Sequence, residues 1–282
     1  MREESGDGWE GRSITIRFRK STGLPALAGC GRFPPVRAPR MAGGPLSPPM
    51  EHEDPVHSSY VPECTDRPQT IGEEIANAIT HGVGAILAVA CLVVGVVFAS
   101  IPPYRDPWNI VSVAIYGATM VLLYLFSTLY HALNHPKTKA VFNYFDHCSI
   151  YLLIAGSYTP FCLSAIRVYS PGWAWAIFGI EWGLAIVGIV FQCLFINRYV
   201  ALSNLTYLAM GWVVLIAVYP LWKAMGFWPV FWIAMGGVAY SLGVIFYAMK
   251  RTKWMHVIWH LFVLAGTLIQ YFVILFCIVL KK

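Results

Sequence analysis

Two histidines near the C-terminal end of the chain, His256 and His260, have the spacing of metal ligands on one helix face. Four residues are close to one 3.6-residue turn, so both imidazoles project from the same side and could share one ion. Residues 261–280 carry no charge and are long enough to cross a bilayer. The Glu of the metalloprotease pattern His-Glu-x-x-His is absent, and the alternative is an interfacial pair bonded to water and headgroups. The pair therefore needs partners from elsewhere in the chain.

The composition is that of a polytopic membrane protein. Hydrophobic residues make up 57% of the 282 residues and charged residues 12%, whereas about one quarter of a soluble domain is charged. After Glu74 the remaining acids are Asp106, Asp146 and Glu181. An acid inside a span is costly, which makes it a candidate functional group. The net charge of +6 comes largely from the N-terminal segment and short loops, so it bears on topology and gives no reason to expect a nucleic-acid partner.

Seven segments have the length and hydropathy of transmembrane helices. They cover residues 82–100, 109–130, 141–163, 173–195, 200–220, 227–249 and 254–280. A short amphipathic helix over residues 70–80, with Thr70 as its cap, is expected before the first span. The predicted fold is an all-α integral membrane protein with a seven-transmembrane-helix bundle over residues 71–282. Residues 1–70, rich in Pro and Arg, are expected to form a disordered tail.

The loop charges predict how the bundle is oriented. The connections after the second, fourth and sixth spans carry six Lys and Arg, and those after the first, third and fifth carry three. Because positive loops stay inside, the even-numbered loops and the N-terminus are expected in the cytosol. The C-terminal Lys281 and Lys282 would then face outside, against the trend.

Seven-helix connectivity brings polar residues of three spans to one depth near the cytosolic face. The second span ends with Ser127 and His131, the third begins with Asp146, and the seventh begins with the histidine pair. Three neutral imidazoles suit zinc and leave a fourth position open, so His131, His256 and His260 are the expected Zn²⁺ ligands. Asp146 is then a fourth ligand or a general base, and Ser127 faces the same cavity. The alternative is an interhelical hydrogen-bond network without metal.

Four other polar residues allow more than one interpretation. His135 is expected to be a solvated loop histidine, and His147 a packing or lipid-interface residue. His81 either caps the first span or contacts Asp146 as an outer partner of the site. Glu181 lies near mid-membrane, where it is either protonated and hydrogen-bonded inside the bundle or faces a water-filled cavity.

The pattern Ser127-x-x-x-His131, Asp146 and His256-x-x-x-His260 is accompanied by three longer motifs. They are Glu-Ile-Ala-Asn-Ala-Ile-Thr-His-Gly at 74–82, Phe-Ser-Thr-Leu-Tyr-His at 126–131 and Ala-Gly-Ser-Tyr-Thr-Pro at 155–160. With these motifs the chain resembles the hemolysin III family over about residues 71–280. That family is a mostly bacterial branch of the progestin and adipoQ receptor superfamily, which includes the adiponectin receptors.

The resemblance implies a zinc site formed by His131, His256 and His260, with Ser127 and Asp146 near the metal. Relatives in the superfamily include ceramidases, so it implies zinc-dependent hydrolysis of an amide or ester bond in a membrane lipid. The partner would be a sphingolipid or another acyl lipid, and the location the plasma membrane. The family name instead records a haemolytic phenotype. The alternative expectation is therefore a pore-forming or receptor-like protein whose zinc is structural.

Overall fold

The computed structural model describes residues 67–196 and 198–281, and every secondary-structure element within them is a helix. The predicted tail, residues 1–70, lies outside this part of the chain except for its last four residues. The long helices are α1 (Ile71–Ser100), α2 (Pro107–Ala132), α3 (Pro136–Pro160), α5 (Pro171–Phe195), α8 (Phe227–Ala248) and α9 (Met255–Ile274). The shorter elements are η1 (Phe161–Ile166), α4 (Arg167–Tyr169), α6 (Val200–Gly211), η2 (Val213–Leu215), α7 (Val218–Met225) and η3 (Leu275–Val279).

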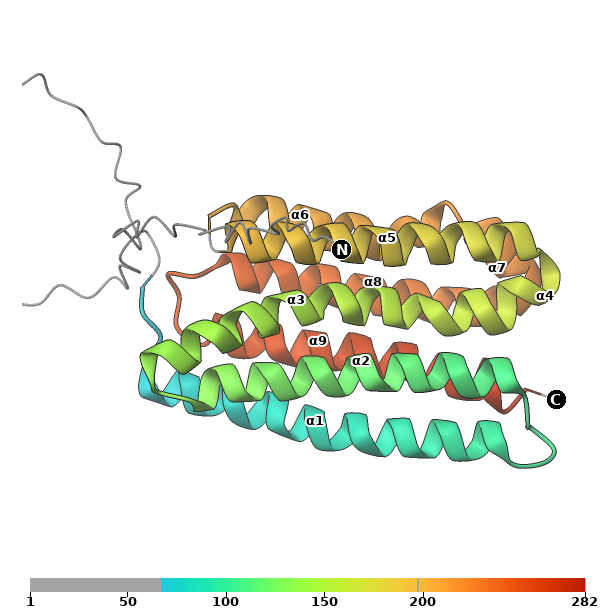
Figure 1. Cartoon of the computed structure of the whole chain (residues 1–282), viewed down its shortest axis with the longest axis horizontal. Helices are drawn as coiled ribbons and strands as arrows, with labels where there is room; N and C mark the ends of the chain where they lie inside the picture. The colour runs from blue at the N-terminus through green and yellow to red at the C-terminus, as the bar shows by residue number, and fades with distance from the viewer. Residues whose placement is uncertain (1–66, 197, 282) are drawn as a thin grey trace, which may run out of the picture. The chain divides into compact units, whose positions relative to one another are not determined.

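Six of the described helices are long and apolar enough to cross a membrane, and α6 with α7 makes a seventh if that bent pair is one span. The expected all-α membrane bundle is therefore confirmed, and the chain is a multi-pass membrane protein. The long helices run side by side (Figure 1), with α9 packed against both α1 and α8 and with α3 packed against both α2 and α5.

Helix α1 joins the expected short helix to the first span. Residues 71–80 continue without a break into that span, and Thr70 caps the helix, as the sequence predicted. Ile71, Ile75 and Ile79 are 55–81% exposed, whereas Glu73 and Asn77 on the opposite face are buried. Surrounding lipid favours apolar side chains outside, so the polar face turns into the bundle. This orientation gives the interior a row of hydrogen-bonding groups.

The fifth expected span, residues 200–220, is broken. Helix α6 ends at Gly211, a 3₁₀ turn follows, and α7 starts at Val218 with a bend of 53° between the two parts. Pro220 explains where the second part begins, because proline lacks an N–H donor and is tolerated only in the first turn of a helix. The sequence prediction treated this span as regular and missed the break.

Helix α3 changes character after Pro160. The next six residues, η1, form a π-helix, in which each backbone N–H bonds one residue further back than in an α-helix.

Close helix contacts elsewhere depend on glycines. A Cβ on Gly188 of α5 would lie 2.2 Å from the Tyr151 ring of α3, so only glycine permits this approach.

Candidate metal centre

His131, His256 and His260 meet where α2 ends and α9 begins. Their metal-binding atoms all lie within 4.8 Å of one another, and this is the one group of three or more His, Cys, Asp or Glu with such spacing in the described chain. The ring centres are 5.1 Å apart for His131 and His260 and 4.7 Å apart for the two histidines of α9. The spacing of four residues thus places the α9 pair on one face, as the sequence predicted, and the third imidazole faces them from α2.

The inner nitrogens of two of these rings have no protein partner. His131 Nε2 and His256 Nε2 are both buried, and neither atom forms a hydrogen bond within the described residues. Leaving one such group unsatisfied costs about 1–3 kcal/mol, so two in one small volume indicate a missing ligand.

Helix α1 fixes the orientation of the His131 ring. The carboxylate of Glu74 accepts a hydrogen bond from His131 Nδ1 at 2.8 Å, and its other oxygen accepts one from Lys139 Nζ at 2.9 Å. The proton of the imidazole is thereby held on Nδ1, which leaves the Nε2 lone pair free for a metal. Carboxylate–histidine pairs of this kind are the usual outer partners of metal-binding imidazoles.

His260 is oriented in the same way by a hydroxyl group of α1. Thr80 Oγ1 donates to the backbone oxygen of Asn77 at 2.9 Å, so its own lone pair is available to accept from His260 Nδ1 at 3.2 Å. The second tautomer is therefore also fixed with its proton on Nδ1. The hydrogen bonds to Glu74 and Thr80 therefore hold His131 and His260 with Nε2 facing inward.

The first turn of α1 also holds the start of α9 in place. Thr70 and Glu73 form a capping box, and Glu73 additionally accepts a hydrogen bond from the backbone N–H of Trp254 at 2.7 Å. Trp254 precedes α9 in the left-handed conformation, with φ of 68°. Arg67 donates two hydrogen bonds to the same carboxylate, and that carboxylate raises the pKa of the guanidinium. The position of His256, two residues beyond Trp254, follows from this anchor.

A fourth histidine belongs to the cluster. The ring of His81 on α1 stacks on that of His260, with 3.5 Å between centres and 9° between planes, and meets Tyr124 edge-on. Both of its nitrogens are buried without a partner in the described part of the protein. His81 therefore neither caps the first span nor bonds to Asp146, the two roles expected from the sequence. It forms one wall of the centre.

The two predicted catalytic residues lie at the same end of the bundle but differ in placement. Ser127 is buried one turn before His131 on α2. Asp146 on α3 is largely buried, with 15% of its side chain exposed, and its Oδ2 lies 3.9 Å from His147 Nδ1. Asp146 is not a member of the three-histidine group. His135 is exposed at the start of α3, which agrees with a solvated loop residue.

These residues fit a zinc ion. The donors are neutral nitrogens, their lone pairs converge, and two of them are buried and unsatisfied, which is the donor set that zinc prefers. Among the described residues the group supplies three ligands, which leaves a position open for another molecule.

Comparison with known proteins agrees with this architecture. The family described as "Haemolysin-III related" matches residues 69–271. The chain is 46% identical over 210 residues to "Hemolysin-3 homolog" of Bacillus subtilis (strain 168), covering 73% of this chain and 95% of the relative. It is 42% identical over 214 residues to "Hemolysin-3" of Bacillus cereus, covering 76% and 95%. The human "Monocyte to macrophage differentiation factor" is 28% identical over 235 residues, covering 80% and 90%.

The chain belongs to the haemolysin-III related family. The match runs from the start of α1 to residue 271 within α9, so every residue of the histidine cluster, with Glu74 and Thr80, lies within it.

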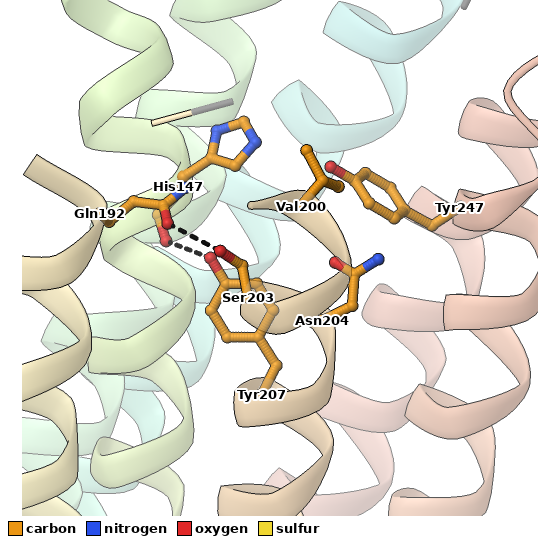
Figure 2. Close-up of a pocket in the computed structure, with 7 residues that line it drawn as sticks. All are labelled: His147, Gln192, Val200, Ser203, Asn204, Tyr207 and Tyr247. Carbon is orange, nitrogen blue, oxygen red and sulfur yellow. Dashed lines mark hydrogen bonds between the residues drawn. The ribbon is translucent and has the colours of Figure 1, made fainter. Parts of the chain in front are cut away.

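A small polar pocket adjoins the cluster in this haemolysin-III related protein. Figure 2 shows its lining, which comes from four helices: His147, Gln192, Val200, Ser203, Asn204, Tyr207 and Tyr247. Ser203 Oγ donates to the side-chain oxygen of Gln192, and Tyr207 donates to the backbone oxygen of His147. The Tyr247 ring lies 5.7 Å from that of His256. His147, expected to be a packing or lipid-interface residue, lines this pocket, one aromatic ring away from the cluster.

Sequence reasoning missed Glu74 and Thr80 as parts of the centre. It placed Glu74 and Thr80 within the motif over residues 74–82 and gave neither of them a role at the centre. The signal was present, because Glu74, Asn77 and His81 recur at three- and four-residue intervals and so share one helix face. The intervening isoleucines are the residues that must face lipid. Recognising this is what would have shown that the Glu74 face turns into the bundle.

Proposed function

We propose that this protein is a zinc-dependent hydrolase that cleaves an amide or ester bond of a membrane lipid in the plasma membrane. The observation that carries the proposal is the convergence of three imidazoles within 4.8 Å inside a membrane-spanning bundle, two of them with buried, unpaired Nε2 atoms. A site at this depth meets lipids and hardly meets soluble substrates. The two bacterial relatives support the plasma membrane as the location.

The protein residues divide the work. His131, His256 and His260 hold the ion, and Glu74 and Thr80 fix the ring orientations. A zinc ion held there would act as a Lewis acid that polarises the carbonyl group of the lipid. The excess of Lys and Arg in the even-numbered loops supports a cytosolic position for this end of the bundle.

Asp146 and Ser127 are the proposed catalytic residues. Asp146 lies outside the three-histidine group, so we assign its carboxylate to accepting a proton from water and not to binding metal. Ser127 Oγ would donate a hydrogen bond to the oxygen that gains charge during cleavage. The polar pocket of Figure 2 would admit water to this end of the bundle through neutral hydrogen-bonding groups.

The test is fatty-acid release from a panel of lipid amides and esters by the zinc-loaded protein in liposomes. We expect Asp146→Asn to keep its zinc and lose turnover by at least about 100-fold, the usual scale for a general base. We expect His260→Ala to lose both, and His135→Ala, a change at an exposed histidine, to lose neither. If zinc-loaded wild-type protein releases no fatty acid from any lipid of the panel, the site is structural or receptor-like.

The printed name of the Bacillus cereus relative, "Hemolysin-3", raises pore formation as a second candidate function. A pore needs a polar lining. On α5 the exposed residues between Trp173 and Phe195 are apolar throughout, which suits contact with lipid and gives that helix no polar outer stripe for an oligomeric channel. The hydrolase therefore remains the proposal, and flux of a small dye from liposomes measures the alternative.

A further inference from the structure

Another unsatisfied polar group lies near the middle of a helix long enough to span the membrane. Glu181 is near the centre of the 25-residue helix α5 and is 0% exposed. Neither of its carboxyl oxygens has a hydrogen-bond partner in the described chain. It belongs to the buried stripe of α5, together with Ile177 and Ala185 one turn away on either side, so it points into the bundle and not into lipid.

The surroundings of Glu181 offer nothing that would stabilise a negative charge. No Lys, Arg or His of the described residues forms an ion pair with it. The titratable groups within electrostatic range are Tyr158 and Cys162, on α3 and η1, and both are uncharged or negative in all their forms. An ionised carboxylate without a partner in a medium of low polarity is far costlier than a neutral acid.

Two irregular stretches of the backbone, the break between α6 and α7 and the π-helix η1, are connected through Tyr158, which lies within electrostatic range of Glu181. The hydroxyl of Tyr158 accepts a hydrogen bond from the backbone N–H of Val214 at 2.9 Å and donates to the backbone oxygen of Gly211 at 2.8 Å. The Tyr158 hydroxyl therefore pairs with backbone groups at the end of α6 and in the turn that separates α6 from α7. The π-helix η1 begins at Phe161, three residues after Tyr158. Interrupted membrane helices and π-helical turns are often found where small ions or protons bind.

We propose that Glu181 is a mid-membrane proton-binding site, distinct from the histidine centre, whose proton exchanges with water when the Tyr158 contacts to the broken span α6–α7 open. The ligand is a single proton, held as a neutral carboxylic acid at neutral pH. This function goes beyond lipid hydrolysis and does not depend on it, since no residue of the histidine centre takes part.

The first part of the test is infrared spectroscopy of the full chain in liposomes at pH 7. A protonated carboxylic acid gives a C=O stretch that a carboxylate does not. We expect wild-type protein to show this band and the near-isosteric Glu181→Gln variant to lose it completely. Glu181→Asp retains a carboxylic acid and should show the band at a shifted frequency. It serves as a second variant if Glu181→Gln misfolds. A wild-type spectrum without such a band, or a band unchanged in Glu181→Gln, would overturn the proposal.

The second part measures how fast that band shifts after transfer to D₂O. Tyr158→Phe removes the hydrogen bonds that close the break, so exchange should become about tenfold faster, the effect of one or two lost buried hydrogen bonds. Tyr116→Phe is the control, because it removes another buried tyrosine hydroxyl, which bonds to the backbone of Thr267 on α9. Equal exchange rates in the two variants would refute the coupling to the broken span.

Discussion

The histidine centre and Glu181 are two buried polar regions of one bundle, and they leave their polar atoms unsatisfied in different ways. At the centre, α1 supplies partners for the Nδ1 atoms of His131 and His260, while the Nε2 atoms of His131 and His256 are buried without any within the described residues. At Glu181 a single acid stands alone. Several converging lone pairs are satisfied by one metal ion, whereas one isolated carboxyl group is satisfied most simply by a proton. The number and direction of unpaired atoms thus indicate the ligand.

The largest expected effect separates the two regions by metal content. His260→Ala removes one of three ligands and should reduce zinc in the purified protein from about one equivalent per chain to near zero. His135→Ala is the matched control, because that histidine is exposed and lies on the same side of the bundle, just before α3. Elemental analysis after gel filtration gives both values. Full zinc content in His260→Ala would contradict the assignment of His260 on α9 as a zinc ligand.

Next in size is the effect of metal on thermal stability. A zinc ion held by the three histidines would bridge α2 and α9, and binding to the folded form alone would add roughly 3–4 kcal/mol at zinc concentrations of 100 to 1,000 times Kd. A chelator should therefore lower the melting temperature of the wild-type protein in detergent and leave that of His131→Ala unchanged. If chelator removed the metal and the melting temperature of the wild-type protein did not change, the claim that zinc stabilises the contact between α2 and α9 would be wrong.

A smaller change is expected from the outer partner of the centre. Glu74→Gln keeps the size of the side chain but weakens the hold on His131, which should lower zinc affinity by about 10–100-fold. Glu181→Gln makes the same chemical change at the other region and should leave zinc affinity as it is. Competition with a fluorescent zinc indicator measures both. Equal losses in the two variants would mean that the regions are coupled.

The smallest effect concerns the packing that places Glu181 against α3. Gly188→Ala introduces a Cβ 2.2 Å from the Tyr151 ring, and overpacking of this kind costs about 1–3 kcal/mol. Gly183→Ala, on the same helix with nothing within 4 Å, should cost nothing or stabilise the helix slightly. Urea or thermal unfolding in detergent distinguishes them, and similar stabilities would show that α5 does not pack closely on α3.

The sequence predicted the membrane bundle and the three histidines because both depend on local regularities. Apolar length identifies spans, and an interval of four residues places His256 and His260 on one face whatever the rest of the fold does. The count of spans then brings His131 to the same depth. The confirmed parts of the prediction therefore needed no knowledge of tertiary contacts.

The missed features depend on which way a helix face turns. The stacking of His81 on His260 and the bond from Glu74 to His131 required α1 to turn its polar face inward, and composition alone left that open. The break at residues 211–217 was missed because its apolar sequence reads as one span. Tyr158, from another helix, supplies the hydrogen bonds that close it.

X-ray absorption at the zinc edge of the purified, zinc-loaded protein tests the central claim most directly. The structure predicts imidazole scattering from three histidines, with zinc–nitrogen distances of about 2.0–2.1 Å. The imidazole contribution should fall by one ring in His256→Ala if that variant still binds metal. A spectrum dominated by sulfur ligands, or one without imidazole scattering, would contradict the histidine centre as the metal site of this protein.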